Sequence, residues 1–317
     1  MLTSEVEKKK ILLITGSGRS GSTLLSKLLN EIEGSFNVNE LVFTHLNGVE
    51  RDYPCNTGDK FSESPIWQKI MAQYGEKNKL DLLKYQPHRI PNTRKLVRAQ
   101  LSPFYQTDEA SNSYFKDYQQ AIKDLYHAIF EATNATMIID SSKIAPFVNV
   151  VTQMEEFDIY VLHLVRDPRA VAYSWQKTIK RQDVDASTNL FMEKRTPTRS
   201  SIRWQLVNIF AASLKEKSNL KYHYLKYEDF ARNPAYHLAE ILRFLGKSPE
   251  EISVKDNQIH LKAIDYGIWG NPNVRQQKDI VKVRYDDTYK EKLSLGARLT
   301  ATIMSMPMLM KYGYRIW

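Results

Sequence analysis

A glycine-rich loop stands between a short apolar run and a helical pattern near the start of this chain. The loop runs from Gly16 to Thr23 and reads Gly-Ser-Gly-Arg-Ser-Gly-Ser-Thr. The run from Ile11 to Thr15 predicts a β-strand before the loop, and Ser22 to Ile32 predicts a helix after it. Glycines let the backbone curl with its amides pointing inward, and the helix adds its positive N-terminal end. The pattern therefore predicts the strand, loop and helix of an α/β fold, with a loop suited to holding a phosphate.

The loop differs from a Walker A loop at one informative position. Gly16 and Gly21 have the Walker spacing, but Ser22 stands where that motif has its lysine. An NTPase uses the lysine on its β- and γ-phosphates, so its absence argues against a triphosphate ligand. Arg19 inside the loop favours a terminal 5′-phosphate group instead. A merely tight turn between a strand and a helix is the structural alternative.

A second motif, Arg166 to Ser174, follows another predicted strand end. Asp167 is expected to cap a helix that starts at Pro168 and runs to about Arg181. In open parallel sheets the ligand binds outside the carboxyl ends of the strands. Arg166 and Ser174 could therefore offer a guanidinium fork and a hydroxyl to a second phosphate. An arginine that stabilises only its own helix start remains an open alternative.

Further short apolar runs alternate with helical patterns along the chain. They are Thr136 to Asp140, Ile159 to Val165 and Tyr222 to Leu225. This alternation predicts a single α/β domain over residues 1–317, with a P-loop-like parallel sheet flanked by helices. A helical insertion over the carboxyl ends of the strands is expected at about 53–131, and a C-terminal loop and helix at about 252–317. The polar stretch from Asp183 to Pro197 is predicted to be a mobile loop.

Composition excludes several classes of protein. Lysine and arginine number 45 against 36 aspartates and glutamates, which gives a formal charge of +9 and favours an acidic ligand. The one cysteine, Cys55, excludes a disulfide framework and fits a reducing compartment. The seven histidines show no metal-ligand spacing. No apolar run is long enough to span a bilayer, so we expect a soluble cytoplasmic protein without an integral membrane segment.

Together, Gly18 to Leu25 and Arg166 to Val171 with Ser174 resemble the phosphosulfate signatures of the PAPS-dependent sulfotransferases, especially of the bacterial and carbohydrate-type branch. The resemblance implies the donor 3′-phosphoadenosine 5′-phosphosulfate (PAPS). It also implies that Arg166 and Ser174 hold the 3′-phosphate, while the first loop holds the 5′-phosphosulfate. The residues of that loop assigned to the donor are Gly18, Arg19, Ser20, Gly21, Ser22, Thr23 and Leu24.

Weaker matches to the same family bear on the chemistry. Asn39-Glu40-Leu41 resembles the segment whose glutamate faces the acceptor hydroxyl, and the block ending at Lys143 resembles one whose lysine approaches the sulfonate. Gly270-Asn271-Pro272 resembles the C-terminal loop that closes over the donor, which implies that Arg275 meets the 3′-phosphate. Bacterial relatives often place several cysteines where this chain has Cys55 alone, so a metal or disulfide role for that region is not expected.

Sulfuryl transfer to an alcohol needs a base, positive charge at the leaving oxygen and in-line positioning. Glu40 is the predicted base, with His45 in reserve, and Lys143 is the predicted partner of the leaving oxygen. Arg19, Lys143 and Arg166 could supply the charge that magnesium gives to phosphoryl transfer, so no metal is expected.

The predicted function is transfer of a sulfonate from PAPS to an acceptor hydroxyl, which leaves adenosine 3′,5′-bisphosphate (PAP). One rival is a P-loop kinase that uses magnesium and ATP. The other is a basic nucleic-acid-binding protein, which the dispersed basic residues disfavour.

The predicted insertion suggests an acceptor class. It contains many aromatic residues, namely Trp67, Tyr74, Tyr85, Phe104, Tyr105, Tyr114, Phe115 and Tyr118. Basic residues lie among them, namely Arg89, Arg94, Lys95 and Arg98. Aromatic faces stack on rings and guanidiniums bind anions, so a glycan, a glycolipid or another ring-bearing small molecule is the expected acceptor. The alternative is that these aromatic residues pack the core of the insertion.

Overall fold

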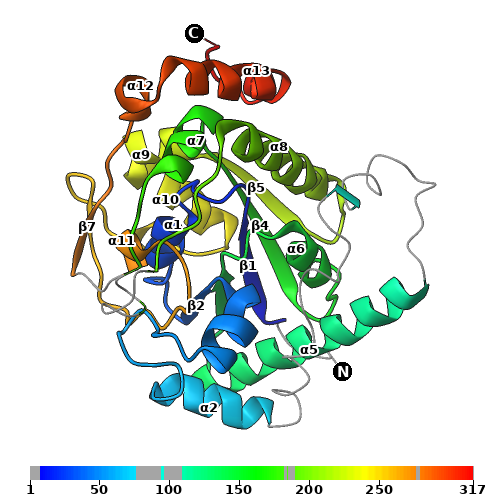
Figure 1. Cartoon of the computed structure of the whole chain (residues 1–317). Coiled ribbons are helices and arrows are strands. Elements are labelled where there is room, and N and C mark those ends of the chain that lie inside the picture. The colour runs from blue at the N-terminus through cyan, green and yellow to red at the C-terminus, as the bar shows by residue number, and fades with distance from the viewer. Residues whose placement is uncertain are drawn as a thin grey trace.

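A computed structural model describes residues 8–75, 94–95, 109–181, 184, 190–275 and 279–316. Its centre is a five-stranded parallel sheet with the strand order β2-β3-β1-β4-β5 (Figure 1). The strands are β1 (Lys10–Thr15), β2 (Ser35–Asn39), β3 (Met137–Asp140), β4 (Asp158–Val165) and β5 (Lys221–Lys226). The predicted α/β class is confirmed. The strand that the sequence did not predict, β2, reads Ser-Phe-Asn-Val-Asn and carries too few apolar residues to stand out.

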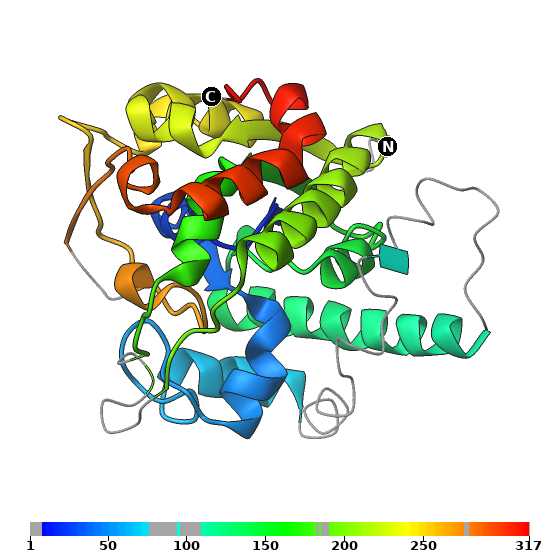
Figure 2. The same cartoon turned by 45° about the horizontal axis from the view of Figure 1, so that its top comes forward.

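Helices cover both faces of the sheet. One face carries α1 (Ser22–Leu29), α9 (Tyr227–Arg232) and α10 (Pro234–Phe244). The other carries α2 (Pro65–Tyr74), α5 (Glu109–Thr133), α6 (Ala145–Val151) and α8 (Pro197–Ser213). Near the C-terminus, α12 (Tyr289–Lys292) and α13 (Leu295–Lys311) pack on α8 and on α7 (Pro168–Gln176) (Figure 2). Other elements are a π-helix at Thr44–Glu50, α11 (Pro272–Arg275) and the antiparallel pair β6 (Gln258–His260) and β7 (Ile280–Lys282).

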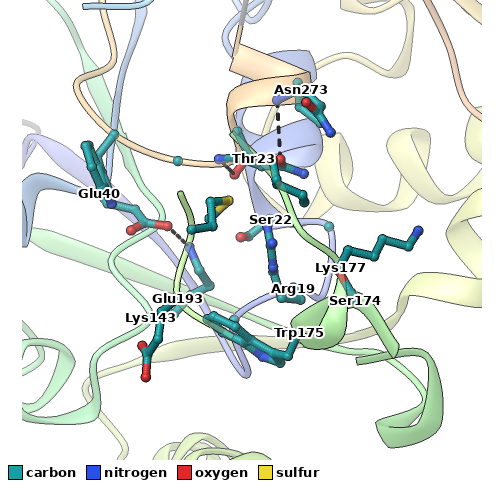
Figure 3. Close-up of a pocket in the computed structure, with 18 of the residues that line it drawn as sticks. Arg19, Ser22, Thr23, Glu40, Lys143, Ser174, Trp175, Lys177, Glu193 and Asn273 are labelled. Atoms are coloured by element: carbon teal, nitrogen blue, oxygen red, sulfur yellow. Dashed lines mark hydrogen bonds and ion pairs between the residues drawn. The ribbon is translucent and has the colours of Figure 1, made fainter. Parts of the chain in front are cut away.

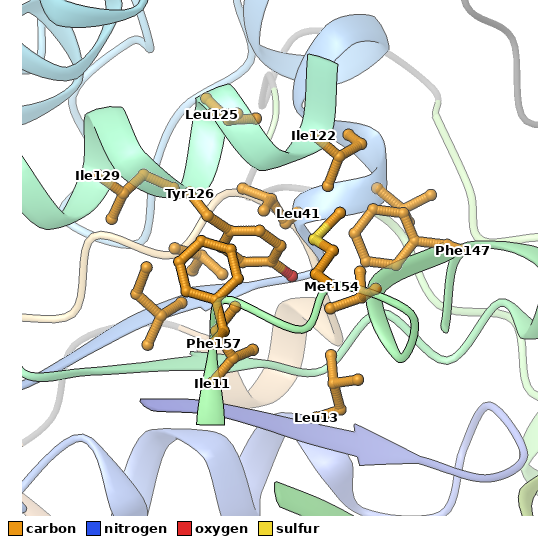
Figure 4. Packing of buried hydrophobic residues seen from close by; sticks show 14 of the residues in the cluster. Ile11, Leu13, Leu41, Ile122, Leu125, Tyr126, Ile129, Phe147, Met154 and Phe157 are labelled. Atoms are coloured by element: carbon orange, nitrogen blue, oxygen red, sulfur yellow. The ribbon is translucent and has the colours of Figure 1, made fainter. Parts of the chain in front are cut away.

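Alternate residues of β1 face the two layers of helices. Ile11 and Leu13 belong to the core beneath α5 and α6, whereas Leu12 and Ile14 belong to the core beneath α1 and α10. All four side chains are at most 1% exposed. Figure 4 shows the first of these cores, where the ring of Tyr126 lies among aliphatic side chains. A strand buried on both faces holds its carboxyl end in a fixed place, and the glycine loop begins at that end.

The described part of the 53–131 segment adds to this core. Trp67, Tyr74 and Tyr118 are at most 2% exposed and pack in the core on the α2 and α5 side, while Tyr114 and Phe115 pack against it. These aromatic residues therefore pack the core, and the prediction that they face an acceptor is wrong for them. Arg94 and Lys95 are exposed. The other predicted members, Tyr85, Arg89, Arg98, Phe104 and Tyr105, lie outside the described residues.

The helix after β4 is shorter than predicted. Its start is as expected, because the Asp167 side chain caps α7 by accepting a hydrogen bond from the Arg169 amide at 2.8 Å. The helix ends at Gln176 rather than near Arg181, because the backbone beyond it pairs with another segment. The Arg181 amide donates to the carbonyl of Leu190 at 2.8 Å, and the Met192 amide donates to that of Ile179 at 2.9 Å.

We call residues 177–195 the strap. The predicted mobile loop, Asp183 to Pro197, overlaps its second half, and residues 182–183 and 185–189 lie outside the described residues. No helix in the described ranges is long and apolar enough to cross a bilayer.

A buried histidine ties β4 to β5 and α8. His163 Nε2 lies 2.8 Å from Asn208 Oδ1, and Nδ1 lies 2.6 Å from the Tyr222 hydroxyl. Because the amide oxygen can only accept, Nε2 carries the proton and Nδ1 accepts from the tyrosine. Burial lowers the pKa of His163 to about 4, so the folded protein holds this ring neutral.

This histidine should make the protein sensitive to acid. Between about pH 6.5 and pH 4 the unfolded chain binds a proton at this position that the folded chain does not, so stability falls as pH falls. We expect the wild type to lose about 2 kcal/mol more than His163→Gln in unfolding free energy between pH 7 and pH 5. Denaturant titrations of both proteins at the two pH values measure this difference. Equal losses would contradict the prediction.

Candidate active site

A cavity of about 580 Å³ lies where the central strands end. Its walls come from the loop after β1, from the segments that follow β2, β3 and β4, and from the strap and the 269–274 segment (Figure 3). The predicted residues that line it are Gly18, Arg19, Gly21, Ser22, Thr23, Leu24, Glu40, Lys143, Arg166 and Ser174. The carboxyl-edge rule for parallel sheets thus brings together residues that are far apart in sequence.

The glycine loop is shaped by two close approaches. At Gly16 (φ 126°) a Cβ atom would lie 2.2 Å from the Leu164 carbonyl oxygen, and at Gly21 (φ 98°) one would lie 2.5 Å from the Tyr227 ring. Arg19 also has a left-handed backbone, with φ at 70°, which is uncommon for a residue with a side chain. No side chain caps the start of α1. Its first amides therefore face the cavity as donors, which is the arrangement that binds anions.

The second predicted motif forms another wall. Arg166 Nη1 donates to the Arg19 carbonyl at 3.3 Å, and its guanidinium lies 4.5 Å from the centre of the Tyr227 ring. Arg166 Nη2 lies 3.5 Å from Asp286 Oδ2. The side chain is thus aimed at the glycine loop, and Ser174 on α7 lines the same cavity.

Positive charge is crowded at the glycine loop. Burial lowers the pKa of Arg19 to about 10, against an opposing effect of the Glu40 carboxylate and with a contribution from neighbouring guanidiniums. These belong to Arg166, Arg181 and Arg195. Within the described residues, Arg19 Nε and Nη2 and Arg166 Nε are buried without a hydrogen-bond partner. Buried donors without acceptors are costly, so this group of arginines is suited to an anion with several oxygens.

Glu40 and Lys143 form an ion pair in the wall of the same cavity. Lys143 Nζ donates to Glu40 Oε1 at 2.6 Å and to the Ser141 carbonyl at 2.7 Å (Figure 3). Their side chains are 15% and 10% exposed, respectively. The strand ends set this geometry, because the backbone turns at Asn39 (φ 55°), the last residue of β2, and the Ser141 amide donates to its carbonyl.

Three predicted residues do not line the cavity. Arg275 is 2% exposed, and it donates to Asn56 Oδ1 at 2.6 Å and to the Pro54 carbonyl, so it anchors a loop rather than meeting a ligand. His45 is buried on the other side of its helical turn, whereas Phe43 and Leu46 line the cavity. The Ser20 side chain is fully buried beneath the loop.

Several residues of the cavity wall were not predicted from the sequence. Arg181 lies over the Trp269 ring at 3.4 Å, and Arg195 lies over the Trp175 ring at 3.8 Å. Arg51 and Arg203 also line the cavity. Arg181 and Arg195 lie in the strap, whose sequence shows no helical or strand periodicity. Their positive charge was therefore the only sequence feature that could have suggested them as site residues.

Asp140, the aspartate that a magnesium site would need, is turned away from the cavity. It is fully buried, with Oδ2 accepting from the Tyr126 hydroxyl and Oδ1 from the Ser142 amide, both at 2.7 Å. Burial raises the pKa of Asp140 to about 6. Among the described residues, no group of three or more His, Cys, Asp or Glu side chains is arranged to hold a metal.

Comparisons with known proteins identify the family and the fold. The model of a family described as "Sulfotransferase family" matches residues 12–251. The sulfotransferase domain of the Synechococcus PCC 7002 olefin synthase is similar in structure, with a TM-score of 0.52, 20% identity, and coverage of 98% of this chain and 97% of that one. The sulfotransferase domain from the curacin biosynthetic pathway has a TM-score of 0.48, 16% identity and coverage of 98% and 99%.

A sulfotransferase from Alicyclobacillus acidocaldarius has a TM-score of 0.43, 12% identity and coverage of 96% of each chain. By sequence, no curated protein matches this chain. At these identities the structural likeness concerns the fold.

The crowded arginines predict binding of a small anion. We expect inorganic pyrophosphate to raise the unfolding temperature, and Arg19→Ala to weaken its binding at least about tenfold, since hydrogen bonds to charged groups contribute about 1.5–3 kcal/mol. Differential scanning fluorimetry over a pyrophosphate titration measures both effects. Arg243→Ala is the control, because Arg243 is exposed on α10 and pairs with Glu240 at 2.6 Å. Equal stabilisation of the Arg19 variant would show that the anion binds elsewhere.

Proposed function

This chain belongs to the sulfotransferase family, and we propose that it transfers the sulfonate of PAPS to the hydroxyl of an acceptor and releases PAP. The observation that carries the proposal is that one cavity holds two anion-binding walls together with a carboxylate–ammonium pair. One wall is the glycine loop with Arg19. The other contains Arg166 and Ser174. A ligand with two separated phosphate groups would engage both walls.

The unpaired donors of the described structure fit such a ligand. Arg19 Nε and Nη2 would receive oxygens of the 5′-phosphosulfate, together with the uncapped amides at the start of α1. Arg166 Nε and the Ser174 hydroxyl would receive the 3′-phosphate. When bound, PAPS supplies an activated sulfonate whose transfer breaks the bond between sulfur and the bridging phosphate oxygen.

Glu40 and Lys143 would handle the proton and the charge. Glu40 Oε1 can accept the proton of a hydroxyl brought beside it, which makes the hydroxyl oxygen a better nucleophile. As Glu40 becomes neutral, it holds the Lys143 ammonium less strongly. Lys143 can then donate to the oxygen that leaves the sulfonate and stabilise its charge. The low exposure of both side chains strengthens these interactions.

The rival functions fit less well. A magnesium-dependent kinase would need a lysine in the loop, where this chain has Ser22. It would also need Asp140 for the metal, but both oxygens of that carboxylate are already occupied by hydrogen bonds. A nucleic-acid-binding protein would present its cations on one face, whereas here a group of them lines a cavity.

We also propose a cytoplasmic location. Cys55, the single cysteine, is buried as a free thiol, and burial raises its pKa to about 12.

Nucleotide binding tests the donor. We expect PAP at about a hundredfold excess over its dissociation constant to add about 2.7 kcal/mol of stability, and ATP with magnesium to add less at the same concentration. Arg166→Ala and Ser174→Ala should remove most of the advantage of PAP over adenosine 5′-phosphate, since both residues are assigned to the 3′-phosphate. Isothermal calorimetry measures these affinities, with Arg243→Ala as control. Preference for magnesium ATP would refute the proposed donor.

Turnover tests the base. We expect Glu40→Gln to lower turnover by about 10²–10⁴-fold while leaving PAP affinity nearly unchanged, because the base contacts the acceptor rather than the nucleotide. The rate of PAP release from PAPS with a hydroxyl acceptor measures this. Glu50→Gln is the matched control, since Glu50 is exposed on the same segment and lies outside the cavity wall. A Glu40 variant that keeps most of its turnover would mean that another group takes the proton.

A further inference from the structure

The side chains that line the cavity change in charge and polarity from its buried part to its exposed part. On one side the chain passes from Glu40, which is 15% exposed, through Phe43 and Leu46 to Arg51, which is exposed. All four side chains line the cavity. The turn from Thr44 to Glu50 is a π-helix, and Arg51 caps its end. Along this wall a carboxylate is followed by apolar side chains, then by Asn47, which also lines the cavity, and then by a guanidinium.

The opposite wall repeats this order with other elements. Lys143 is 10% exposed, its neighbour Ile144 is half-buried, and Val207 of α8 is buried. Arg203 lies one helical turn before Val207 and is exposed. Four residues of an α-helix span about 6 Å, so this apolar zone is long enough for several methylene groups. All four residues line the cavity.

The described part of the strap adds apolar side chains to the cavity, alongside the charged side chains of Lys177, Arg181, Glu193 and Arg195. Ile179, Leu190 and Met192 line it, and Phe191 does so with 48% of its surface exposed. A neutral sugar has hydroxyls on every side and would leave them without partners against such a wall. The apolar zone instead favours an acceptor with a hydrocarbon body next to the reacting hydroxyl.

The ring of Trp269, which also lines the cavity, is already in contact with an arginine. The Arg181 guanidinium lies over the Trp269 ring at 3.4 Å and occupies a face on which a sugar would stack. The Tyr53 ring is stacked with Trp269 at 5.9 Å. Trp269 therefore supports an arginine, and we do not assign it to a glycan.

The two rim arginines are available to an anion. Within the described ranges, neither Arg51 nor Arg203 forms an ion pair, while Glu193 pairs with Arg195 at 2.8 Å and with Arg199 at 3.5 Å. The guanidinium of Arg51 lies 5.8 Å from the Tyr53 ring, which helps to hold it in place. The exposed part of the cavity lining thus offers two guanidiniums.

We infer that the acceptor is an amphipathic molecule with its hydroxyl at one end, an apolar body, and a carboxylate or phosphate at the far end. The hydroxyl would lie beside the Glu40–Lys143 pair, the body along the apolar zone, and the anion at Arg51 and Arg203. This inference rests on the proposed function, because it takes Glu40 and Lys143 as the reacting end.

Binding to the purified full chain tests the acceptor class without turnover. Calorimetry compares an ω-hydroxy fatty acid of medium chain length with its methyl ester, which has the same hydroxyl and the same chain. An ω-hydroxyalkyl phosphate is the second anionic probe, and a methyl glycoside is the neutral sugar. Each is titrated with and without PAP. We expect the acid or the phosphate to bind about tenfold more tightly than the ester, and the glycoside to bind more weakly than both.

The double variant Arg51→Ala, Arg203→Ala should bring the anionic probe to the affinity of the ester and leave the ester unchanged. Arg199→Ala is the matched control, since Arg199 lies on α8 with a 71% exposed side chain outside the cavity wall, and it should keep the preference. Equal binding of acid, phosphate and ester, no binding of either anion, tighter binding of the glycoside, or a preference that survives the double variant would each overturn the inference. Failure of the proposed function is a different result, namely no binding of PAP and no release of PAP from PAPS.

Discussion

Repulsion among the cations that line the cavity is the constraint on which this site depends. Eight lysine and arginine side chains line one cavity against the three carboxylates of Glu40, Glu193 and Asp286. Such an arrangement is unfavourable without an anion, so the surrounding structure must hold it in place. The fully buried strands β1 and β4 do so, because their hydrophobic cores on both faces fix the positions at which Arg19 and Arg166 leave the sheet. Sheet packing therefore offsets the cost of the charged cavity.

The sequence predicted the parts of the site that follow from local rules. A glycine loop between a strand and a helix has few other conformations, and Gly16 and Gly21 do occupy positions where a side chain would clash. Parallel strands place their carboxyl ends at one edge, so Glu40, Lys143, Arg166 and Ser174 meet although they are far apart in the chain. The α/β class and most strand positions were predictable for the same reason, since alternating apolar runs are local signals.

The parts that could not be predicted depend on long-range packing. An aromatic residue at helical spacing gives the same sequence pattern whether it faces a core or a ligand. Trp67 and Tyr118 lie in the hydrophobic core. The strap has no periodic pattern, so nothing in the sequence placed Arg181 over Trp269. His45 and Leu46 are neighbours, but only Leu46 lines the cavity, because a π-helix turns them to different sides. A prediction based on ordinary helical spacing cannot make that distinction.

The C-terminal segment helps to position Glu40, the carboxylate proposed as the base. Asn56 Nδ2 and Asn37 Nδ2 donate to the buried carboxylate of Asp265 at 2.8 Å and 3.1 Å. Asn37 Nδ2 also donates to Asn39 Oδ1 at 3.2 Å, and at Gly267 a Cβ atom would lie only 2.2 Å from Asn39 Nδ2. Arg275 completes the network by holding Asn56 from the other side. These contacts keep Asn39 in its left-handed conformation, and that conformation aims the next residue, Glu40, at Lys143. The arginine that the family resemblance assigned to the 3′-phosphate thus contributes, through Asn56 and Asp265, to the position of the carboxylate proposed as the base.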